Sequence, residues 1–122
     1  MAKKILVVDD VDDSRSILTI ILRSFGYESI EAANGGEAVK KALSEKPDLI
    51  LLDLGLPDIS GIEVAKTIKE NPTTAHIPII AYTAWTTSEW KEAAARAGIT
   101  DYLVKPFPMK LMKDRLEKII TP

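Results

Sequence analysis

The sequence predicts an α/β fold in which helices cover both faces of an open, doubly wound parallel sheet. Four short runs rich in Ile, Leu, Val and Tyr are typical of strands buried on both faces, and helical patterns alternate with them. Each run also ends in a polar residue. Because a tight hairpin cannot join two parallel strands, this strict alternation implies right-handed crossovers, and ligands then bind beyond the carboxyl ends of the strands.

The strands follow from these runs. They are expected at residues 5–8, 49–52, 79–82 and 102–104, with a weaker strand near Ile30. The first helix is expected over 14–25, where Leu18, Leu22 and Phe25 recur at helical spacing. Asp13 or Ser14 can cap its start, and Gly26 stands where a left-handed cap belongs.

Four further apolar stripes indicate the remaining helices. They cover residues 38–43, 62–68, 90–97 and 112–120, and Asn-Gly, Asn-Pro, Gly98 and Pro108 mark their limits. Trp90 belongs to the third stripe and is expected in the core. The prediction is therefore a five-stranded sheet with five helices, in the flavodoxin-like strand order 2-1-3-4-5.

Length and composition limit the classes of function. The 122 residues, taken as residues 1–122, suit one domain, and we expect no output domain. A net charge of -2 gives no reason to expect a nucleic acid or membrane partner. Without cysteines, a signal peptide or a long apolar run, the expected location is cytoplasmic.

Three carboxylates are expected to converge at the strand ends. Asp9 and Asp10 follow the first strand and Asp53 follows the third, its neighbour in the predicted sheet. At separations near 5 Å, and with an effective dielectric of about 20, each pair repels by roughly 3 kcal/mol. Either one acid is protonated or a cation lies there. Because the ligands are all oxygen, the sequence predicts a Mg²⁺ site.

A carboxylate beside Mg²⁺ can attack a phosphoryl group and become an aspartyl phosphate, if nearby groups neutralise the phosphoryl oxygens. Lys105 and Thr83 end the two strands on the side of Asp53, so Asp53 is the expected acceptor. The remaining polar residues have plainer explanations. Helix caps or turns account for Asp12, Asp13, Asp48 and Asp58, and a surface position accounts for His76.

These residues, in this order, resemble the receiver domain of two-component response regulators over residues 4–120. The resemblance is carried by Asp9-Asp10, the segment from Asp53 to Gly61, Thr83-Ala84, Tyr102 and Lys105-Pro106. It implies that Asp53 accepts phosphate from a histidine kinase or a phosphotransfer protein. It also implies that Asp10 binds Mg²⁺ directly, Asp9 binds it through water, and Gly55 offers a backbone carbonyl.

The resemblance further implies a switch. Thr83 moves towards the phosphoryl oxygens, which Ala84 and Lys105 also stabilise, and Tyr102 rotates inward. The surface of the fourth helix, fifth strand and fifth helix then changes for a downstream effector protein. A cis bond before Pro106 aims Lys105, and phosphodonor contacts are expected on the first helix around Arg15 and Leu18. The alternative for Tyr102 is that it does not switch and is an ordinary aromatic residue of the sheet, with its hydroxyl at the surface.

Gly55 and Trp85 differ from the residues that the family most often has beside the attacking water. One hypothesis is that Trp85 shields the phosphoryl group while Gly55 cannot position water, so that phosphate is lost slowly. The alternative is that Trp85 is a loop aromatic or a partner contact.

Two other functions stay open on the sequence. Asp10-Val11-Asp12 is loosely similar to the start of haloacid-dehalogenase phosphatases, in which the first Asp is the nucleophile. That interpretation leaves Asp53 without a role. The other open function is a binding module that has the receiver shape but works without phosphate. The presence of the acceptor Asp53, the pair Asp9-Asp10, Thr83 and Lys105 counts against it.

Overall fold

The computed structural model, which describes residues 2–84 and 88–120, confirms the predicted fold. Its single sheet has five parallel strands in the order β2-β1-β3-β4-β5. The strands are β1 (Lys4–Val8), β2 (Glu28–Ala32), β3 (Leu49–Asp53), β4 (Ile79–Thr83) and β5 (Asp101–Val104). The helices are α1 (Asp12–Ser24), α2 (Gly35–Glu45), α3 (Gly61–Glu70), α4 (Ser88–Arg96) and α5 (Met109–Ile119).

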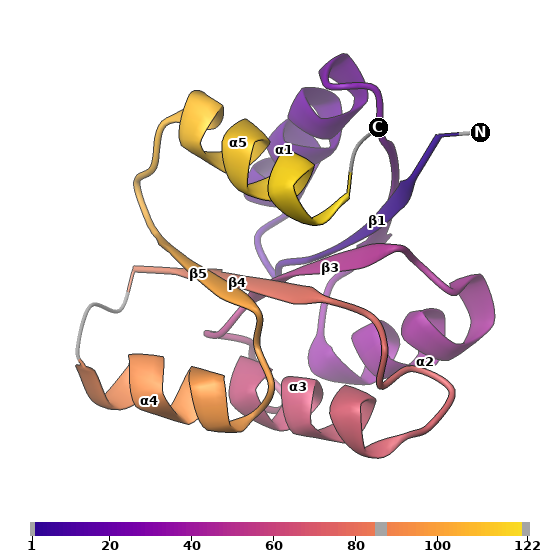
Figure 1. Ribbon diagram of the computed structural model, residues 1–122, viewed down its shortest axis with the longest axis vertical. Helices are drawn as coiled ribbons and strands as arrows, with labels where there is room; N and C mark the ends of the chain where they lie inside the picture. Colours follow the sequence, from indigo (N-terminus) through magenta and orange to yellow (C-terminus); the bar gives the residue numbers. More distant parts are fainter. Residues whose placement is uncertain (1, 85–87, 121–122) are drawn as a thin grey trace.

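The helices form two layers, one on each face of the sheet. Helices α1 and α5 cover one face, and α2, α3 and α4 cover the other (Figure 1). Side chains of the strands alternate between the two cores: Ile5 and Val7 of β1 pack with α1 and α5, whereas Leu6 and Val8 pack with the other three helices. Because both faces of β1, β3 and β4 are buried, these strands are runs of mainly apolar residues, as the sequence indicated, whereas the edge strand β2 carries the exposed Glu28 and Glu31.

The register of the sheet brings the strand ends together. Val8 is aligned with Leu52, and Asp53 is aligned with Tyr82 on the next strand. Asp9, one residue beyond Val8, therefore lies level with Asp53 at the carboxyl end of the sheet.

The start of α1 differs from the prediction. The helix begins at Asp12 after Val11, and no side chain caps it. Asp13 lies in the first turn, and the Ser14 hydroxyl donates instead to Asp9 Oδ2 at 2.7 Å. The Ser14 side chain thus serves as a donor to Asp9, not as an acceptor for the first N–H groups of the helix.

The end of α1 is as predicted. Gly26 has a φ of 95°, and its N–H donates to the Arg23 carbonyl at 3.0 Å. The next N–H, from Tyr27, reaches back to the Leu22 carbonyl at 3.0 Å. Two carbonyls of the last turn are satisfied in this way, and glycine carries the left-handed conformation at little cost.

Of the four carboxylates assigned to caps or turns, Asp48 and Asp58 bind backbone N–H groups, whereas Asp12 and Asp13 lie in the first turn of α1 without capping it. Asp48 Oδ2 accepts the Lys4 N–H at 2.8 Å, which ties the start of β3 to that of β1. The two oxygens of Asp58 accept the N–H groups of Gly35 and Gly36 at 2.8 and 3.0 Å. These bonds, on the first turn of α2, lower the pKa of Asp58.

Two minor predictions are also confirmed. Trp90 packs against the core beneath α4, and His76 is exposed. Across residues 2–84 and 88–120, no helix combines the length and the apolar character that a membrane span requires.

Candidate functional site

Three carboxylates meet at the carboxyl end of the sheet. One oxygen from each of Asp9, Asp10 and Asp53 lies within 4.8 Å of the other two. Asp9 and Asp53 are buried, whereas Asp10 is exposed. The strand tips therefore hold a cluster of negative charge that is buried at Asp9 and Asp53 and open to solvent at Asp10.

Lys105 supplies the cation that this cluster needs. Its Nζ lies 3.2 Å from Asp53 Oδ2 and 4.0 Å from Asp9 Oδ2. The backbone N–H of Lys105 donates to the Thr83 carbonyl at 2.7 Å, and the bond to Pro106 is cis. The lysine thus pairs with Asp53 more closely than with Asp9.

Asp9 is held by three donors from the protein. The Val11 N–H donates to Oδ1 at 2.9 Å. The hydroxyls of Ser14 and Tyr82 donate to Oδ2 at 2.7 and 2.9 Å. Burial, and then the charge of Asp9, raise the pKa of Tyr82 far above its ordinary value, so the hydroxyl stays protonated and acts as a donor.

Asp53 is fixed by its own loop. Its Oδ1 accepts the Gly55 N–H at 3.0 Å, while Oδ2 faces Lys105. The start of α3 approaches this loop closely: a Cβ on Gly61 would lie 2.6 Å from Leu54 Cα and 2.7 Å from the Asp53 carbonyl oxygen. Glycine at position 61 is therefore what allows α3 to begin directly behind the candidate acceptor.

The residues predicted to switch surround this pair on the side of β4 and β5. Thr83 is buried at the end of β4, and Ala84 beyond it is exposed. Tyr102 is half-buried against the core on the α4 side, and burial raises its pKa. Trp85 lies outside the described residues, and the rotation of Tyr102 stays a prediction.

The predicted partner contacts on α1 need a correction. Leu18 is buried in the core, and only 14% of the Arg15 side chain is exposed. The Arg15 guanidinium donates to the Asp9 carbonyl at 2.7 Å, and it pairs with Asp12 at 2.6 Å and with Glu31 at 3.1 Å. The exposed apolar residues of α1 are instead Ile17 and Ile20.

Sequence reasoning did not identify Tyr82, Ser14 or Arg15 as parts of this site. Tyr82 stood inside a predicted strand and was counted only as a core residue. A signal was available, because a buried tyrosine needs a partner for its hydroxyl and Tyr82 is one residue from the strand end. Ser14 and Arg15 gave no comparable signal, since their contacts depend on the path of the loop that precedes α1.

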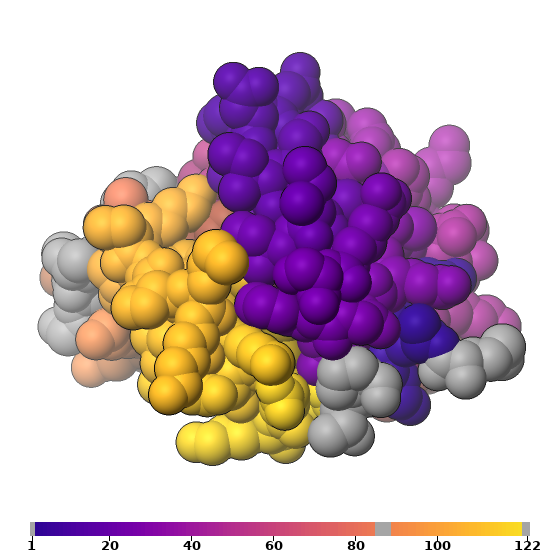
Figure 2. All heavy atoms as spheres, turned by 90° about the horizontal axis from the view of Figure 1, so that it is seen from above, coloured from indigo at the N-terminus to yellow at the C-terminus, as the bar shows by residue number. Residues whose placement is uncertain are grey.

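A pocket of about 510 Å³ lies next to the carboxylates. Its walls are apolar residues of α1 and of the segment from β5 to α5, two elements that lie side by side on the face shown in Figure 2. Ser14, Tyr82 and Lys105 also line it. Three side chains that contact the carboxylates therefore also line the pocket.

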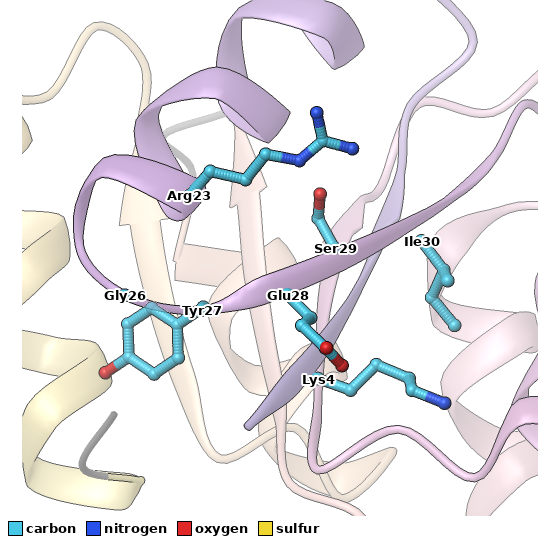
Figure 3. Close-up of a pocket in the computed structure, with 7 residues that line it drawn as sticks. All are labelled: Lys4, Arg23, Gly26, Tyr27, Glu28, Ser29 and Ile30. Atoms are coloured by element: carbon cyan, nitrogen blue, oxygen red, sulfur yellow. The ribbon is translucent and has the colours of Figure 1, made fainter. Parts of the chain in front are cut away.

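A second pocket, of about 490 Å³, lies at the other end of the sheet, around the start of β2 (Figure 3). The charged groups of Arg23 and Lys4 lie apart there, with Ser29 and Glu28 between them. Within the described ranges, the buried Ser29 hydroxyl is the side-chain group left without a hydrogen-bond partner. Because its two cations do not converge, this pocket is not built to bind an anion.

The sequence of residues 5–117 matches the family model of the response regulator receiver domain. The chain belongs to this family of two-component signalling domains. The match runs from within β1 to within α5, and it includes the carboxylate cluster and Lys105. The predicted resemblance is thereby confirmed.

Known relatives support the same assignment. The receiver domain is 39% identical, over 120 residues, to the phosphate regulon transcriptional regulatory protein PhoB of Pseudomonas aeruginosa. That alignment covers 98% of this chain and 52% of PhoB, so the chain spans about half the length of that regulator.

Solved structures agree with the fold. The chemotaxis protein CheY4 of Vibrio cholerae matches with a TM-score of 0.93 and 32% identity, covering 98% of this chain and 100% of that one. The receiver domain of the sensor histidine kinase PA1611 from Pseudomonas aeruginosa has a TM-score of 0.90 and 32% identity, with 98% of each chain covered. That structure holds a magnesium ion coordinated in its active site cleft.

The carboxylates of this receiver domain fit a magnesium ion. They offer oxygen atoms alone, and at least one of them, Asp10, is open to solvent for the water ligands that Mg²⁺ retains. The phosphatase interpretation fits less well. Asp12, its expected acid, lies on α1 with 86% of its side chain exposed and paired with Arg15.

Proposed function

We propose that this receiver domain is a phospho-accepting switch and that Asp53 is the residue that becomes phosphorylated. The observation that carries the proposal is the pairing of Lys105 Nζ with Asp53 Oδ2 at 3.2 Å, beside two further carboxylates. Asp53 is the carboxylate that lies closest to this cation and shares its loop with a backbone donor, the Gly55 N–H.

Asp9, Asp10 and Asp53, with the Gly55 carbonyl, would hold the Mg²⁺. Asp10 is the exposed member and would bind directly, whereas Asp9, with both oxygens already accepting hydrogen bonds, would act through water. Bound here, the ion would offset the repulsion between the carboxylates and the charge of an incoming phosphoryl group.

The reaction at Asp53 is a phosphoryl transfer. One Asp53 oxygen forms the new P–O bond while the P–N bond of a phosphohistidine on the donor breaks, and the histidine leaves with its electron pair. Lys105 then neutralises one phosphoryl oxygen, and Thr83 and Ala84 at the end of β4 supply hydrogen-bond donors. The donors come from the end of β4, which pairs with β3, and the cation follows β5, the next strand of the sheet.

The phosphoryl donor would be a histidine kinase or a histidine phosphotransfer protein in the cytoplasm. Phosphate would bias the domain between two states, in which Thr83 and Tyr102 move and the face of α4, β5 and α5 changes. A downstream effector protein would read that face.

Phosphorylation can be tested with acetyl phosphate as the donor. Wild type, Asp53→Asn and Asp48→Asn are incubated with the donor in Mg²⁺ or in EDTA, and intact mass is measured. The two substitutions are matched because both residues are aspartates at an end of β3: Asp48 directly precedes the strand, and Asp53 is its last residue. We expect a Mg²⁺-dependent adduct in wild type and Asp48→Asn and none in Asp53→Asn.

Two results would contradict the proposal. An adduct that persists in Asp53→Asn would place the acceptor elsewhere. A wild type that binds no Mg²⁺ and takes no phosphate would favour the phosphate-independent binding module instead.

A further inference from the structure

Tyr82 is the buried side chain that connects the parts of the site. It is only 1% exposed, and it lies on β4 next to Thr83. Its hydroxyl lies 2.9 Å from Asp9 Oδ2, and the centroid of its ring lies 4.7 Å from Lys105 Nζ. The rings of Tyr82 and Phe107 form a T-shaped pair with their centroids 6.5 Å apart. One residue thus contacts an acid, the cation and the wall of the adjacent pocket.

The hydroxyl of Tyr82 has one proton and two acceptors within reach. Asp9 Oδ2 lies at 2.9 Å and the Val8 carbonyl at 3.1 Å. A hydrogen bond to a carboxylate is shorter and stronger than one to a neutral carbonyl, so the proton is directed to Asp9. Together with the Ser14 hydroxyl, it occupies both lone pairs of Oδ2.

This arrangement affects Lys105. The lysine stands 3.2 Å from Asp53 and 4.0 Å from Asp9, so the two carboxylates compete for its ammonium group. Two hydroxyl donors on Asp9 Oδ2 reduce that competition, because the oxygen they occupy is the one that faces Lys105. The Tyr82 ring adds a cation–π contact that supports the lysine from below.

We propose that Tyr82 is a positioning residue of the phosphoacceptor site, an inference that rests on the proposed function. Its hydroxyl holds Asp9 in place within the carboxylate cluster that would bind the metal, and its ring holds Lys105 towards Asp53. A tyrosine that only filled the core would need none of these contacts, and phenylalanine would replace it without effect on the site.

The chain offers a matched control in Tyr27. This residue is also buried, and its hydroxyl donates to the Ile120 carbonyl at 2.8 Å, at a place that shares no residue with the carboxylate cluster. Tyr82→Phe and Tyr27→Phe therefore each remove one buried hydroxyl and one hydrogen bond. Any general loss of stability should be similar in the two variants, and urea unfolding measures it.

The test is Mg²⁺ binding by isothermal titration calorimetry, together with the rate of phosphorylation by acetyl phosphate. We expect Tyr82→Phe to weaken Mg²⁺ binding by about tenfold, as is typical when a partner of a metal-binding carboxylate is removed, and to slow phosphorylation. Tyr27→Phe should stay within about twofold of wild type on both measures. In ¹H–¹⁵N spectra without metal, the Val11 amide, which donates to Asp9, should shift in Tyr82→Phe alone.

Ser14→Ala provides a second variant, at a half-buried position on α1. It removes the other hydroxyl from the same oxygen of Asp9, and it should weaken Mg²⁺ binding in the same direction. Wild-type affinity and rate in both Tyr82→Phe and Ser14→Ala would overturn the inference and leave the proposed function intact. A wild type that neither binds Mg²⁺ nor accepts phosphate would overturn both.

Discussion

The two ends of the sheet carry the same kinds of charged residue but use them differently. At the amino end, Asp48 accepts the backbone N–H of Lys4 at 2.8 Å, and the Lys4 side chain donates to the Glu45 carbonyl at 3.3 Å. At the carboxyl end, Asp53 and Lys105 face each other at 3.2 Å beside two more acids. Charges at the first end satisfy the backbone, whereas charges at the second end mainly balance one another.

This difference follows from the direction of parallel strands. Their carboxyl ends meet at one edge, where the chain leaves the sheet for a helix and polar side chains from several strands come within reach. A site that depends on balanced charge can change when one more charge arrives. We infer that a phosphoryl group has its effect at the carboxyl end for this reason, and the variants below test the contrast between the two ends.

The largest contrast is expected between Lys105→Ala and Lys4→Ala. Lys105→Ala should slow phosphorylation by acetyl phosphate by about 10²-fold, because it removes the cation that faces Asp53. It should also abolish the spectral response to beryllofluoride while Mg²⁺ binding is largely retained. Lys4→Ala should do neither. A Lys105→Ala protein that still switches would show that the ammonium group is not the phosphoryl partner.

Gly61→Ala and Gly36→Ala compare two glycines in the first turn of a helix. A Cβ at Gly61 would press on the backbone of Asp53 and Leu54, so we expect a loss of about 1–3 kcal/mol in the free energy of unfolding by urea. A Cβ at Gly36 would meet only two side-chain oxygens at 3.6 Å, so that variant should be neutral or slightly more stable. Equal effects of the two substitutions would argue against close packing of α3 against the backbone of Asp53 and Leu54.

Asp10→Asn tests the repulsion within the cluster. In EDTA it should raise the free energy of unfolding by about 1 kcal/mol, a value kept small because Asp10 is exposed to solvent. Asp12→Asn is the control, since Asp12 pairs with Arg15 at 2.6 Å and its loss should be neutral or slightly destabilising. An Asp10→Asn protein no more stable than wild type would mean that Lys105 already balances the cluster.

The smallest effect is expected at Asp58, away from the cluster. Hydrogen bonds from Gly35 and Gly36 lower its pKa in the folded state, so its contribution to stability is present above the unfolded pKa, roughly 3.9. That contribution is lost as the pH falls through the folded pKa. In Asp58→Asn the pH dependence of urea unfolding should be flatter in this acidic range than in wild type. An unchanged pH profile would show that the two amide bonds contribute nothing.

Most of the fold could be predicted from the sequence because both faces of the sheet are buried. Continuous apolar runs located β1, β3, β4 and β5, and helical spacing located the helices, so their alternation indicated a parallel sheet. The edge strand β2, with Glu28 and Glu31, gave a weaker signal. The strand tips Asp9, Asp53 and Lys105 could be placed together for the same reason.

The contacts made by α1 and its preceding loop could not be predicted. Ser14 was expected as a cap, but its hydroxyl bonds to Asp9, and Arg15 was expected to face a partner, but it binds the Asp9 carbonyl. Tyr82 was hidden inside an apolar run although it reaches across the sheet to the same aspartate. These contacts form between segments far apart in the chain, and local patterns do not encode such pairings.

The most direct test of the contrast is a map of ¹H–¹⁵N amide shifts as Mg²⁺ and then beryllofluoride are added. The large changes should fall at the carboxyl end, at Val11, Gly55, Thr83 and Lys105. The amides of Lys4, Glu28 and Asp48 at the amino end should stay unchanged. Changes of equal size at both ends, or none at the carboxyl end, would contradict the assignment of function to that edge of the sheet.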